Sequence, residues 1–224
     1  MKVSGAKVAE HRAALVAAAK RLLKERGFDG AGVAEISRES GLTQGALYGQ
    51  FKSKDALAAE AARKAFADGA AAWSELRDTA PDALSAYLDA YLSNAHVKEV
   101  GSGCLMAACV SEVSRQNPAI GAAFAEGFLT LVDLMQKALP KATPPEAARR
   151  RALALISAMA GSVAMARALE TSDPSLSREI VAAAREELEQ LAVGGDRVSS
   201  RPATLSSSTH QIISEPRERR RRRD

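Results

Sequence analysis

The sequence predicts an all-α protein, and composition and hydrophobic spacing agree on this. Alanine, the residue with the best intrinsic helix propensity, is very abundant in the 224-residue chain, whereas runs of β-branched residues are nearly absent. Hydrophobic residues make up 46% of the chain and charged residues 26%, as in ordinary globular proteins. Apolar residues also recur at helical spacing between breaks that contain Gly or Pro. We therefore expect a helical chain with one large domain or two modest ones.

These breaks divide the chain into about nine helices with no strand between them. The expected helices cover residues 7–26, 33–40, 44–50, 54–77, 81–94, 104–115, 118–139, 145–170 and 174–192. The first carries Leu15, Leu22 and Leu23 on its apolar face. Gly27 is suited to end it, because glycine readily adopts a left-handed cap.

The next three helices are marked by their turns and caps. Gly41 separates the two short helices that follow the first. Thr43 stands where its hydroxyl can cap the third helix by accepting a hydrogen bond from an orphan backbone N–H, and Ser53 can do the same for the fourth. Asp55 then lies in the first turn of that long fourth helix, where a negative charge is favourable.

Prolines and loops separate the later helices. Pro81 opens the fifth helix, and the segment KEVGSG is a loop before the sixth. Pro118 stands in the first turn of the seventh helix, and PKATPP is the linker to the eighth. The ninth helix follows Asp173, its expected cap, with Pro174 at the first helical position.

Charge is distributed unevenly along the chain. Residues 1–63 carry 11 Lys/Arg against 7 Asp/Glu, residues 64–195 carry 12 against 16, and residues 196–224 carry 8 against 4. A basic head, an acidic body and a basic tail favour a polyanionic partner at one or both ends, although chance surface variation would give the same pattern. From residue 194 the chain is rich in Gly, Ser and Pro and then contains five consecutive arginines, a composition typical of disorder.

Several classes of protein are disfavoured. No apolar run approaches the roughly 20 residues needed to span a bilayer, and charges interrupt the N-terminal segment where a signal peptide would be apolar. Two cysteines, Cys104 and Cys109, are too few and too close for a disulfide framework. We find no phosphate-binding glycine loop, metal-ligand cluster or nucleophile elbow. The expectation is a cytoplasmic protein that is not an enzyme, with no cofactor, metal or membrane contact; a dyad of Cys104 with His96 is conceivable but unsupported.

Residues 33–50 have the pattern of a helix-turn-helix unit, in which two short helices meet at a tight turn. Ile36 and Leu47 are placed to pack between the two helices, Gly41 supplies the turn, and Leu42 fills the corner. The second helix would then present its polar side chains outward, as DNA-reading helices do.

The outward residues have chemistry suited to DNA. Gln44 can read an adenine edge or donate to a phosphate, and Gly45 lets the backbone approach a duplex closely. Tyr48 offers a hydroxyl donor on a rigid ring, with hydrophobic packing as its alternative role. Lys52 and Lys54 add positive charge near a helix N-terminus, which itself attracts phosphate.

The segment GFDGAGVAEISRESGLTQGALYGQFKSKDAL resembles the N-terminal domain of the TetR family of bacterial transcriptional regulators. The residues that carry the resemblance are Gly27, Phe28, Ile36, Ser37, Gly41, Leu42, Thr43, Gly45, Leu47, Tyr48, Phe51 and Lys54. The resemblance implies that Thr43, Gln44, Gly45, Tyr48 and Lys54 contact operator DNA. Gln50 and Lys52 join these candidates through their own chemistry and position, although a solvated or capping role is an equal alternative for Gln50.

The chain departs from the family pattern at two points. Ala31 and Gly32 stand where relatives often have a Thr or Ser that caps the second helix, so a side-chain phosphate contact there is in doubt. Gly49 replaces what is often a larger polar residue.

The family implies three regions: a helix-turn-helix domain over 1–53, a ligand-binding and dimerisation domain over 54–193, and a basic tail over 194–224. It also implies a homodimer that represses transcription at a palindromic operator on the bacterial nucleoid until a small effector releases it. The apolar faces of residues 145–192 are suited to pair with a second copy as a four-helix bundle, with an intramolecular core as the alternative.

The effector site is the least defined prediction. Family pockets lie among the middle helices, and the aromatic, histidine and methionine residues there suggest an apolar or amphipathic ligand. The candidate wall residues, each of which plain core packing would also explain, are Trp73, Tyr87, Tyr91, His96, Met106, Phe124, Phe128, Met135 and Met159.

Two rival readings remain open. Cys104 stands at or just before a helix N-terminus, where a thiolate is favoured, so the regulator could respond to oxidants or electrophiles; a buried structural role is the alternative. The arginine tail could instead bind RNA or a membrane surface.

Overall fold

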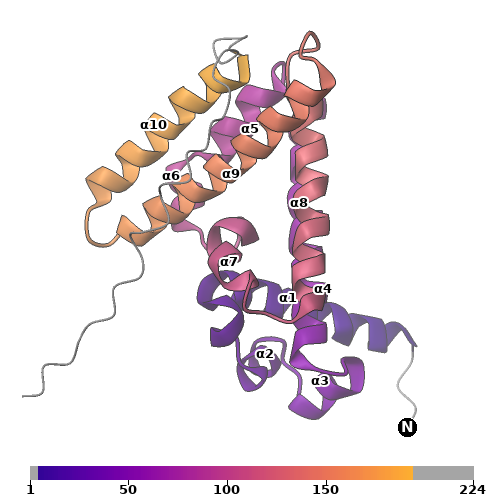
Figure 1. The fold of residues 1–224 in the computed structure, drawn as a ribbon. Helices are drawn as coiled ribbons and strands as arrows, with labels where there is room; N and C mark the ends of the chain where they lie inside the picture. Colours follow the sequence, from indigo (N-terminus) through magenta and orange to yellow (C-terminus); the bar gives the residue numbers. More distant parts are fainter. Residues whose placement is uncertain (1–4, 194–224) are drawn as a thin grey trace, which may run out of the picture. The chain divides into compact units, whose positions relative to one another are not determined.

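The computed structural model describes residues 5–193, and within this range the chain forms ten α-helices and no strand (Figure 1). The helices are α1 (Gly5–Gly30), α2 (Val33–Glu39), α3 (Gln44–Gln50), α4 (Lys54–Thr79), α5 (Ala83–Tyr91), α6 (Asn94–Lys98), α7 (Leu105–Val113), α8 (Pro118–Ala138), α9 (Pro145–Leu169) and α10 (Pro174–Val193). The all-α class predicted from the sequence is confirmed. The predicted basic tail over 194–224 lies outside the described residues.

The sequence predicts about nine helices and the described residues form ten, because a short helix, α6, follows the segment predicted as a helix over 81–94. α5 ends at Tyr91, and the chain turns before α6 begins at Asn94. The Ser93 hydroxyl caps the new helix by accepting a hydrogen bond from the His96 backbone N–H at 3.2 Å. The break has a consequence for the interior, since it turns His96 toward the middle of the protein.

The predicted starts and stops near the N-terminus are present. Gly27 interrupts α1 with a φ of 75°, although helical turns resume as far as Gly30. Thr43 caps α3 by accepting the Ala46 N–H at 3.1 Å, and Ser53 caps α4 by accepting the Ala56 N–H at the same distance. Local side-chain chemistry therefore defines the helix boundaries that position the helix-turn-helix unit.

Two long helix pairs organise the body. α4 packs along α8, and α9 packs along α10, while α1 contacts both α4 and α7 (Figure 1). One continuous apolar core joins these layers, and its largest fully buried side chains include Leu22, Leu57, Tyr87, Met135 and Leu155. α4 begins directly after the helix-turn-helix region and packs against α1 and α8, so it connects that region with the body.

α7 forms a second junction with α1. The Glu112 carboxylate accepts a hydrogen bond from the Phe28 backbone N–H at 2.8 Å, just after the kink at Gly27. Before the kink, the Cys109 thiol of α7 donates a hydrogen bond to the Leu23 carbonyl at 3.1 Å. The end of α1 is thus held to α7 on both sides of the kink.

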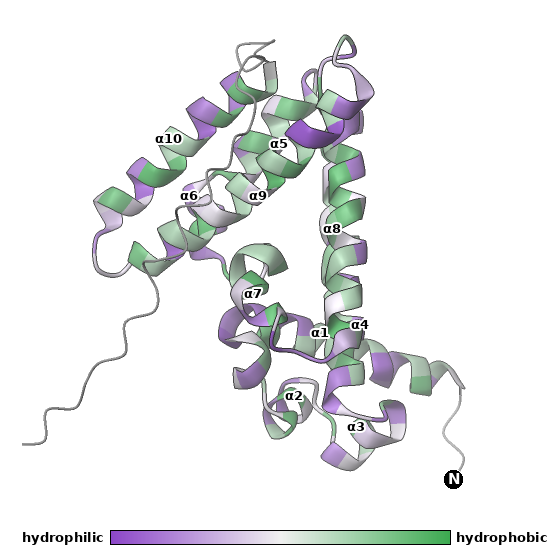
Figure 2. Cartoon of the chain, in the orientation of Figure 1, coloured by the Kyte–Doolittle hydropathy of each residue, from purple (hydrophilic) through white to green (hydrophobic). Residues whose placement is uncertain are grey.

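Two helices of the body are long and mostly apolar. α8 and α9 are each long and apolar enough, by length and composition alone, to cross a membrane. Figure 2 shows apolar residues along both. About 44% and 39% of their most apolar windows are buried inside the protein, and core helices commonly pass such a test. The apolar surface that α9 leaves uncovered is considered with the dimer below.

Candidate functional site

The helix-turn-helix unit is held by a tight turn and an apolar contact. Gly41 adopts a φ of 70°, a left-handed conformation that glycine tolerates best. Beside it, the Leu42 N–H donates to the Ser37 carbonyl at 2.9 Å. Ile36 and Leu47, only 1% and 0% exposed, belong to the same buried cluster and fix α2 against α3. The packing roles predicted for these two residues are confirmed.

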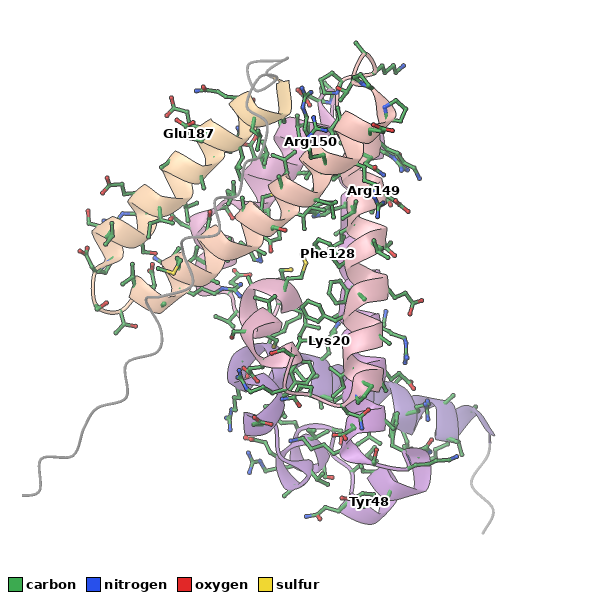
Figure 3. All side chains as sticks on the ribbon, viewed as in Figure 1. Lys20, Tyr48, Phe128, Arg149, Arg150 and Glu187 are labelled. Atoms are coloured by element: carbon green, nitrogen blue, oxygen red, sulfur yellow. The ribbon has the colours of Figure 1, made fainter. Side chains whose placement is uncertain are left out.

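The outer surface of α3 and the following turn carries the predicted DNA contacts. Tyr48 is 55% exposed and projects away from the other helices (Figure 3), so it does not take the alternative packing role. The other candidates share this surface: Thr43, Gln44, Gly45 and Lys52 are exposed, whereas Gln50 and Lys54 are partly exposed. Their contact with DNA stays a prediction.

Arg12 anchors the C-terminal end of α3, which sequence reasoning did not anticipate. Its guanidinium donates to the Gln50 carbonyl at 2.9 Å and stacks over the Phe51 ring, 4.2 Å from the ring centroid. The same group pairs with Glu60 of α4. One side chain of α1 therefore connects α3 with α4. The only sequence signal was an arginine at a polar position of the first helix.

The start of α2 agrees with the noted departure from the family pattern. Gly32 occupies the N-cap position, and no side chain caps the helix there. Ala31 is fully buried. A phosphate contact at this point would rest on the backbone alone.

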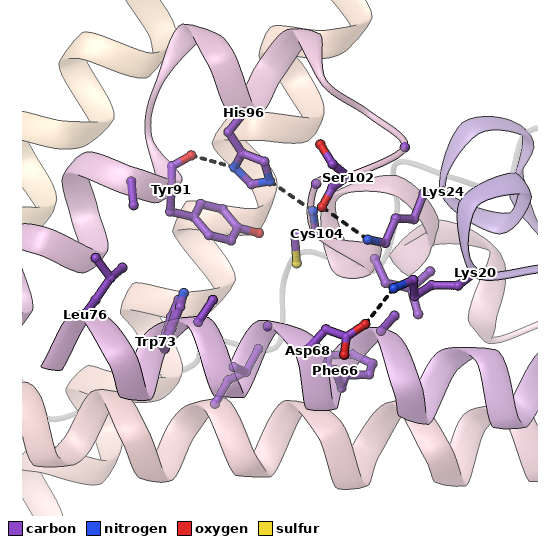
Figure 4. Close-up of a pocket in the computed structure, with 18 residues that line it drawn as sticks. Lys20, Lys24, Phe66, Asp68, Trp73, Leu76, Tyr91, His96, Ser102 and Cys104 are labelled. Carbon is purple, nitrogen blue, oxygen red and sulfur yellow. Dashed lines mark hydrogen bonds and ion pairs between the residues drawn. The ribbon is translucent and has the colours of Figure 1, made fainter. Parts of the chain in front are cut away.

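A cavity of about 400 Å³ lies where α1 and α4 face the α5–α6 segment and the loop that leads into α7 (Figure 4). Trp73, Tyr91 and His96, predicted from the sequence, line it. The other sequence candidates pack in the surrounding core: Tyr87, Met106, Phe124, Phe128, Met135 and Met159. Tyr87, for example, supports the wall from behind, because its ring stacks on Trp73 with centroids 4.5 Å apart.

His96 is held on both sides of its ring (Figure 4). The Cys104 backbone N–H donates to Nε2 at 2.9 Å, so Nε2 is the unprotonated nitrogen, and Nδ1–H then donates to the Tyr91 carbonyl at 2.7 Å. Burial lowers the pKa of His96, outweighing the Tyr91 hydrogen bond that favours the charged form. The ring is therefore a neutral support between α5 and the loop, with both nitrogens already engaged.

Positive charge stands around the cavity in positions the sequence reading missed. Lys20 pairs with Asp68 at 2.6 Å. Lys24 is only 8% exposed, and its ammonium donates to the Ser102 carbonyl at 3.3 Å. Lys20 and Lys24 lie one turn apart on α1, a spacing that looks like an ordinary solvated face. Lys24 is buried because α7 and the loop before it cover that face of α1.

The two cysteines differ in access. Cys104 lines the cavity, is partly exposed, and stands at the N-cap of α7. Cys109 is fully buried, and burial raises the pKa of its thiol to about 12. Within residues 5–193, no group of three or more His, Cys, Asp or Glu side chains is arranged to hold a metal ion.

Two family models match the chain and together cover most of the helical part. The model for bacterial regulatory proteins of the tetR family matches residues 15–68. The model for the C-terminal domain of LmrA/YxaF-like transcriptional regulators matches residues 80–177. No curated protein sequence matches the chain.

Solved structures share the fold at low sequence identity. The reduced form of E. coli NemR is 22% identical, with a TM-score of 0.68 over 80% of this chain and 95% of that chain. A TetR-family regulator from Agrobacterium tumefaciens is 18% identical, with a TM-score of 0.67 over 83% and 100%. FadR from Bacillus subtilis, in complex with stearoyl-CoA, is 16% identical, with a TM-score of 0.59 over 81% and 98%. Both family models and this shared fold agree with the helix-turn-helix geometry: the chain belongs to the TetR family of DNA-binding bacterial transcriptional regulators.

Proposed function

We propose that the protein is an effector-responsive repressor that binds a palindromic operator as a homodimer and releases it when a small molecule occupies the cavity. The observation that carries this proposal is the position of the cavity. Its wall includes Lys20 and Lys24 of α1 together with residues of α4 from Ala65 to Leu76. These are the two helices that Arg12 connects to the recognition helix α3. A ligand that changes the contact between α1 and α4 therefore acts on the support of α3.

The ligand must favour the released state for this to work. Tight binding that is equal in the two states would leave operator occupancy unchanged. A shape change of the α1–α4 contact supplies the required difference, because the separation of two recognition helices must match half-sites about 34–36 Å apart. FadR shares the fold and is seen with stearoyl-CoA, which supports a ligand-holding role for such a body.

The outer face of α9 and α10 supports the homodimer. Part of the apolar faces predicted over 145–192 is internal, since Ile156, Val163 and Leu188 are buried within the chain. Large apolar side chains remain outside: Met165 is 56%, Leu176 40% and Leu191 44% exposed. These positions are the ones a second copy would cover.

Small residues on the same face of α9 would let a partner helix approach closely. A side chain added at Gly161 meets no atom within 4 Å, so the position is open in the single chain. Gly161→Arg should convert the dimer to a monomer, as measured by light scattering after size exclusion. Gly121→Arg on α8, also open within 4 Å, is the matched control. A dimer that survives Gly161→Arg would place the interface elsewhere.

The operator test begins with selection of genomic DNA fragments by the full-length protein. Anisotropy of a labelled fragment then gives the affinity, the stoichiometry and the effect of added small molecules. Two protomers per site and release by a compound that occupies the cavity are expected. Binding to RNA or vesicles but to no DNA fragment would overturn the proposal. Deletion of residues 196–224, outside the described range, should remove only salt-sensitive, non-specific affinity.

A second candidate mechanism is sensing of electrophiles by Cys104, favoured by its access to the cavity and its place at the start of α7. Titration with a chromogenic disulfide reagent should then show one reactive thiol, because Cys109 remains protonated far above neutral pH. Operator release by a thiol-alkylating compound should disappear in Cys104→Ser. If both thiols react only after unfolding, this mechanism is excluded.

A further inference from the structure

The wall of the cavity holds a buried lysine, Lys24, that forms no ion pair with the described residues. Lys24 is 8% exposed, and its ammonium donates a hydrogen bond to the Ser102 carbonyl at 3.3 Å. Asp68 also lines the cavity, but its carboxylate is shared between Lys20 at 2.6 Å and Lys64 at 2.5 Å. A buried charge without an opposite partner is costly, so its presence calls for an explanation.

A second cation stands directly behind the loop that lines the cavity. Arg167 of α9 donates to the His96 carbonyl at 2.8 Å and to the Val97 carbonyl at 3.3 Å. Its Nη1 is buried without a hydrogen-bond partner, and none of the ion pairs among the described residues includes Arg167 or Lys24. The guanidinium lies close to Gly103, where an added Cβ would be 2.4 Å from its Nη2. The two positive charges therefore face the same end of the cavity.

A buried hydroxyl, with the Cys104 thiol beside it, also lies at this end. Tyr91 is 6% exposed and lines the cavity, and its hydroxyl is buried without a partner in the part of the chain that the structure describes. Figure 4 shows this hydroxyl beside Cys104, with Lys24 on the other side of Cys104. Burial raises the pKa of Tyr91 well above its ordinary value, so the group stays a neutral O–H donor.

The opposite side of the cavity is apolar. Phe66, Trp73 and Leu76 of α4 and Leu131 of α8 line it. An occupant that satisfies both sides has an acid group at one end and an apolar body at the other. A neutral apolar molecule would fill the volume of about 400 Å³ but would leave Lys24 unbalanced.

We propose that the cavity binds an organic anion, in which Lys24 and the Tyr91 hydroxyl hold a carboxylate or similar acid group and the α4 side holds the apolar body. This inference rests on the proposed effector role and names the chemical class of that effector. Arg167 adds positive charge from behind the loop without touching the ligand. The charge-assisted hydrogen bond from Lys24 is the main source of selectivity.

The test uses matched pairs of probes that differ only in charge. 4-Phenylbutyrate, 1-naphthoate and decanoate are compared with their neutral primary amides. Trp73 is the only tryptophan of the chain and lines the cavity, so its fluorescence reports occupancy directly. At least one acid should bind tenfold or more tightly than its amide. Lys24→Met should remove this preference, and Lys24→Arg should restore part of it.

Controls separate charge selectivity from folding and from the switch. Lys137→Met, at an exposed position of α8 outside the cavity, should keep the preference. Equal binding of acid and amide, a preference that survives Lys24→Met, or no binding by any acid would overturn the inference. Operator anisotropy is read separately. Acid-selective binding that leaves DNA bound would keep the anion site and overturn the effector role. Release of DNA by both acid and amide would keep the effector role and overturn the anion site.

Discussion

The surface of α3 and the wall of the cavity use polar side chains in opposite ways. On α3 the polar side chains are exposed or partly exposed, and Tyr48 is 55% exposed. In the cavity the polar groups are buried between helices, as with Lys24 at 8% and Tyr91 at 6% exposure. We therefore expect substitutions on α3 to alter DNA binding alone. Substitutions in the cavity should alter the stability of the fold and ligand binding together.

The same substitution at two glycines gives the sharpest contrast. Gly103→Ala should destabilise the fold by about 1–3 kcal/mol, because the new Cβ would lie 2.4 Å from Arg167 Nη2 and 2.9 Å from the His96 ring, and both groups are held by hydrogen bonds. Gly45→Ala meets only Thr43 Oγ1 at 3.8 Å and should leave stability within about 1 kcal/mol of the wild type. Chemical denaturation measures both.

Operator affinity should show the reverse order for these two variants. Gly45→Ala should weaken DNA binding, because a side chain there separates the backbone from the duplex. Equal stability losses at the two positions would contradict the comparison.

Two substitutions on the outer surface should affect DNA binding without affecting the fold. Tyr48→Phe removes a hydroxyl, and Lys54→Ala removes a charge near the start of α4. Each should cost about 1–2 kcal/mol of operator binding, roughly tenfold, since each removes one hydrogen bond or charge contact to DNA. Anisotropy gives the affinity, and light scattering and thermal unfolding show whether assembly and stability are retained. Unchanged affinity in both variants would place the DNA contacts elsewhere.

Replacing the buried lysine should stabilise the protein. Lys24→Met keeps the length of the side chain and removes a charge that burial disfavours, as the lowered pKa of Lys24 indicates, so the free energy of unfolding should rise by about 1 kcal/mol. The control Lys137→Met is exposed and should change it by less than about 0.5 kcal/mol. A loss of stability in Lys24→Met would show that the ammonium has a structural role.

The smallest expected effect is a pH dependence that belongs to the cavity. The folded-state pKa of His96 lies below its ordinary value of 6.5, chiefly because of burial, and the nearby charges of Arg167 and Lys24 lower it further. As pH falls below 6.5 the unfolded chain binds the proton first. The contribution of His96 to the free energy of unfolding is thus fully present above that pH. Below it, this contribution declines by at most about 1.4 kcal/mol per pH unit. Unfolding of His96→Gln measured from pH 5 to pH 8 should show a flatter profile than the wild type.

The helix boundaries around α2 and α3 could be predicted from the sequence because their signals are local. Gly41, Thr43 and Ser53 act on residues within a few positions of themselves, and the structure has the expected turn and caps. The burial of Ile36 and Leu47 follows from helical spacing alone. Membership of the TetR family followed from the same short segment.

The charged groups around the cavity could not be predicted from the sequence, because distant segments bring them together. Lys24 reads as a surface residue of an amphipathic helix until the loop carrying Ser102 covers it, 78 residues later in the chain. Arg167 meets the His96 carbonyl across 71 positions. His96 lies in α6, which begins after the cap at Ser93 and was not among the predicted helices. Of the aromatic candidates, burial alone could not separate wall residues from core residues.

The junction of α1 with α7 lies a short distance from the cavity. α7 is a rod of 9 residues, about 13 Å long, and its two ends touch different parts of the protein. Cys104 at one end lines the cavity, while Glu112 near the other end accepts the Phe28 N–H beside the kink at Gly27. If the proposed ligand displaces α7, the displacement reaches the end of α1 over the length of one short helix.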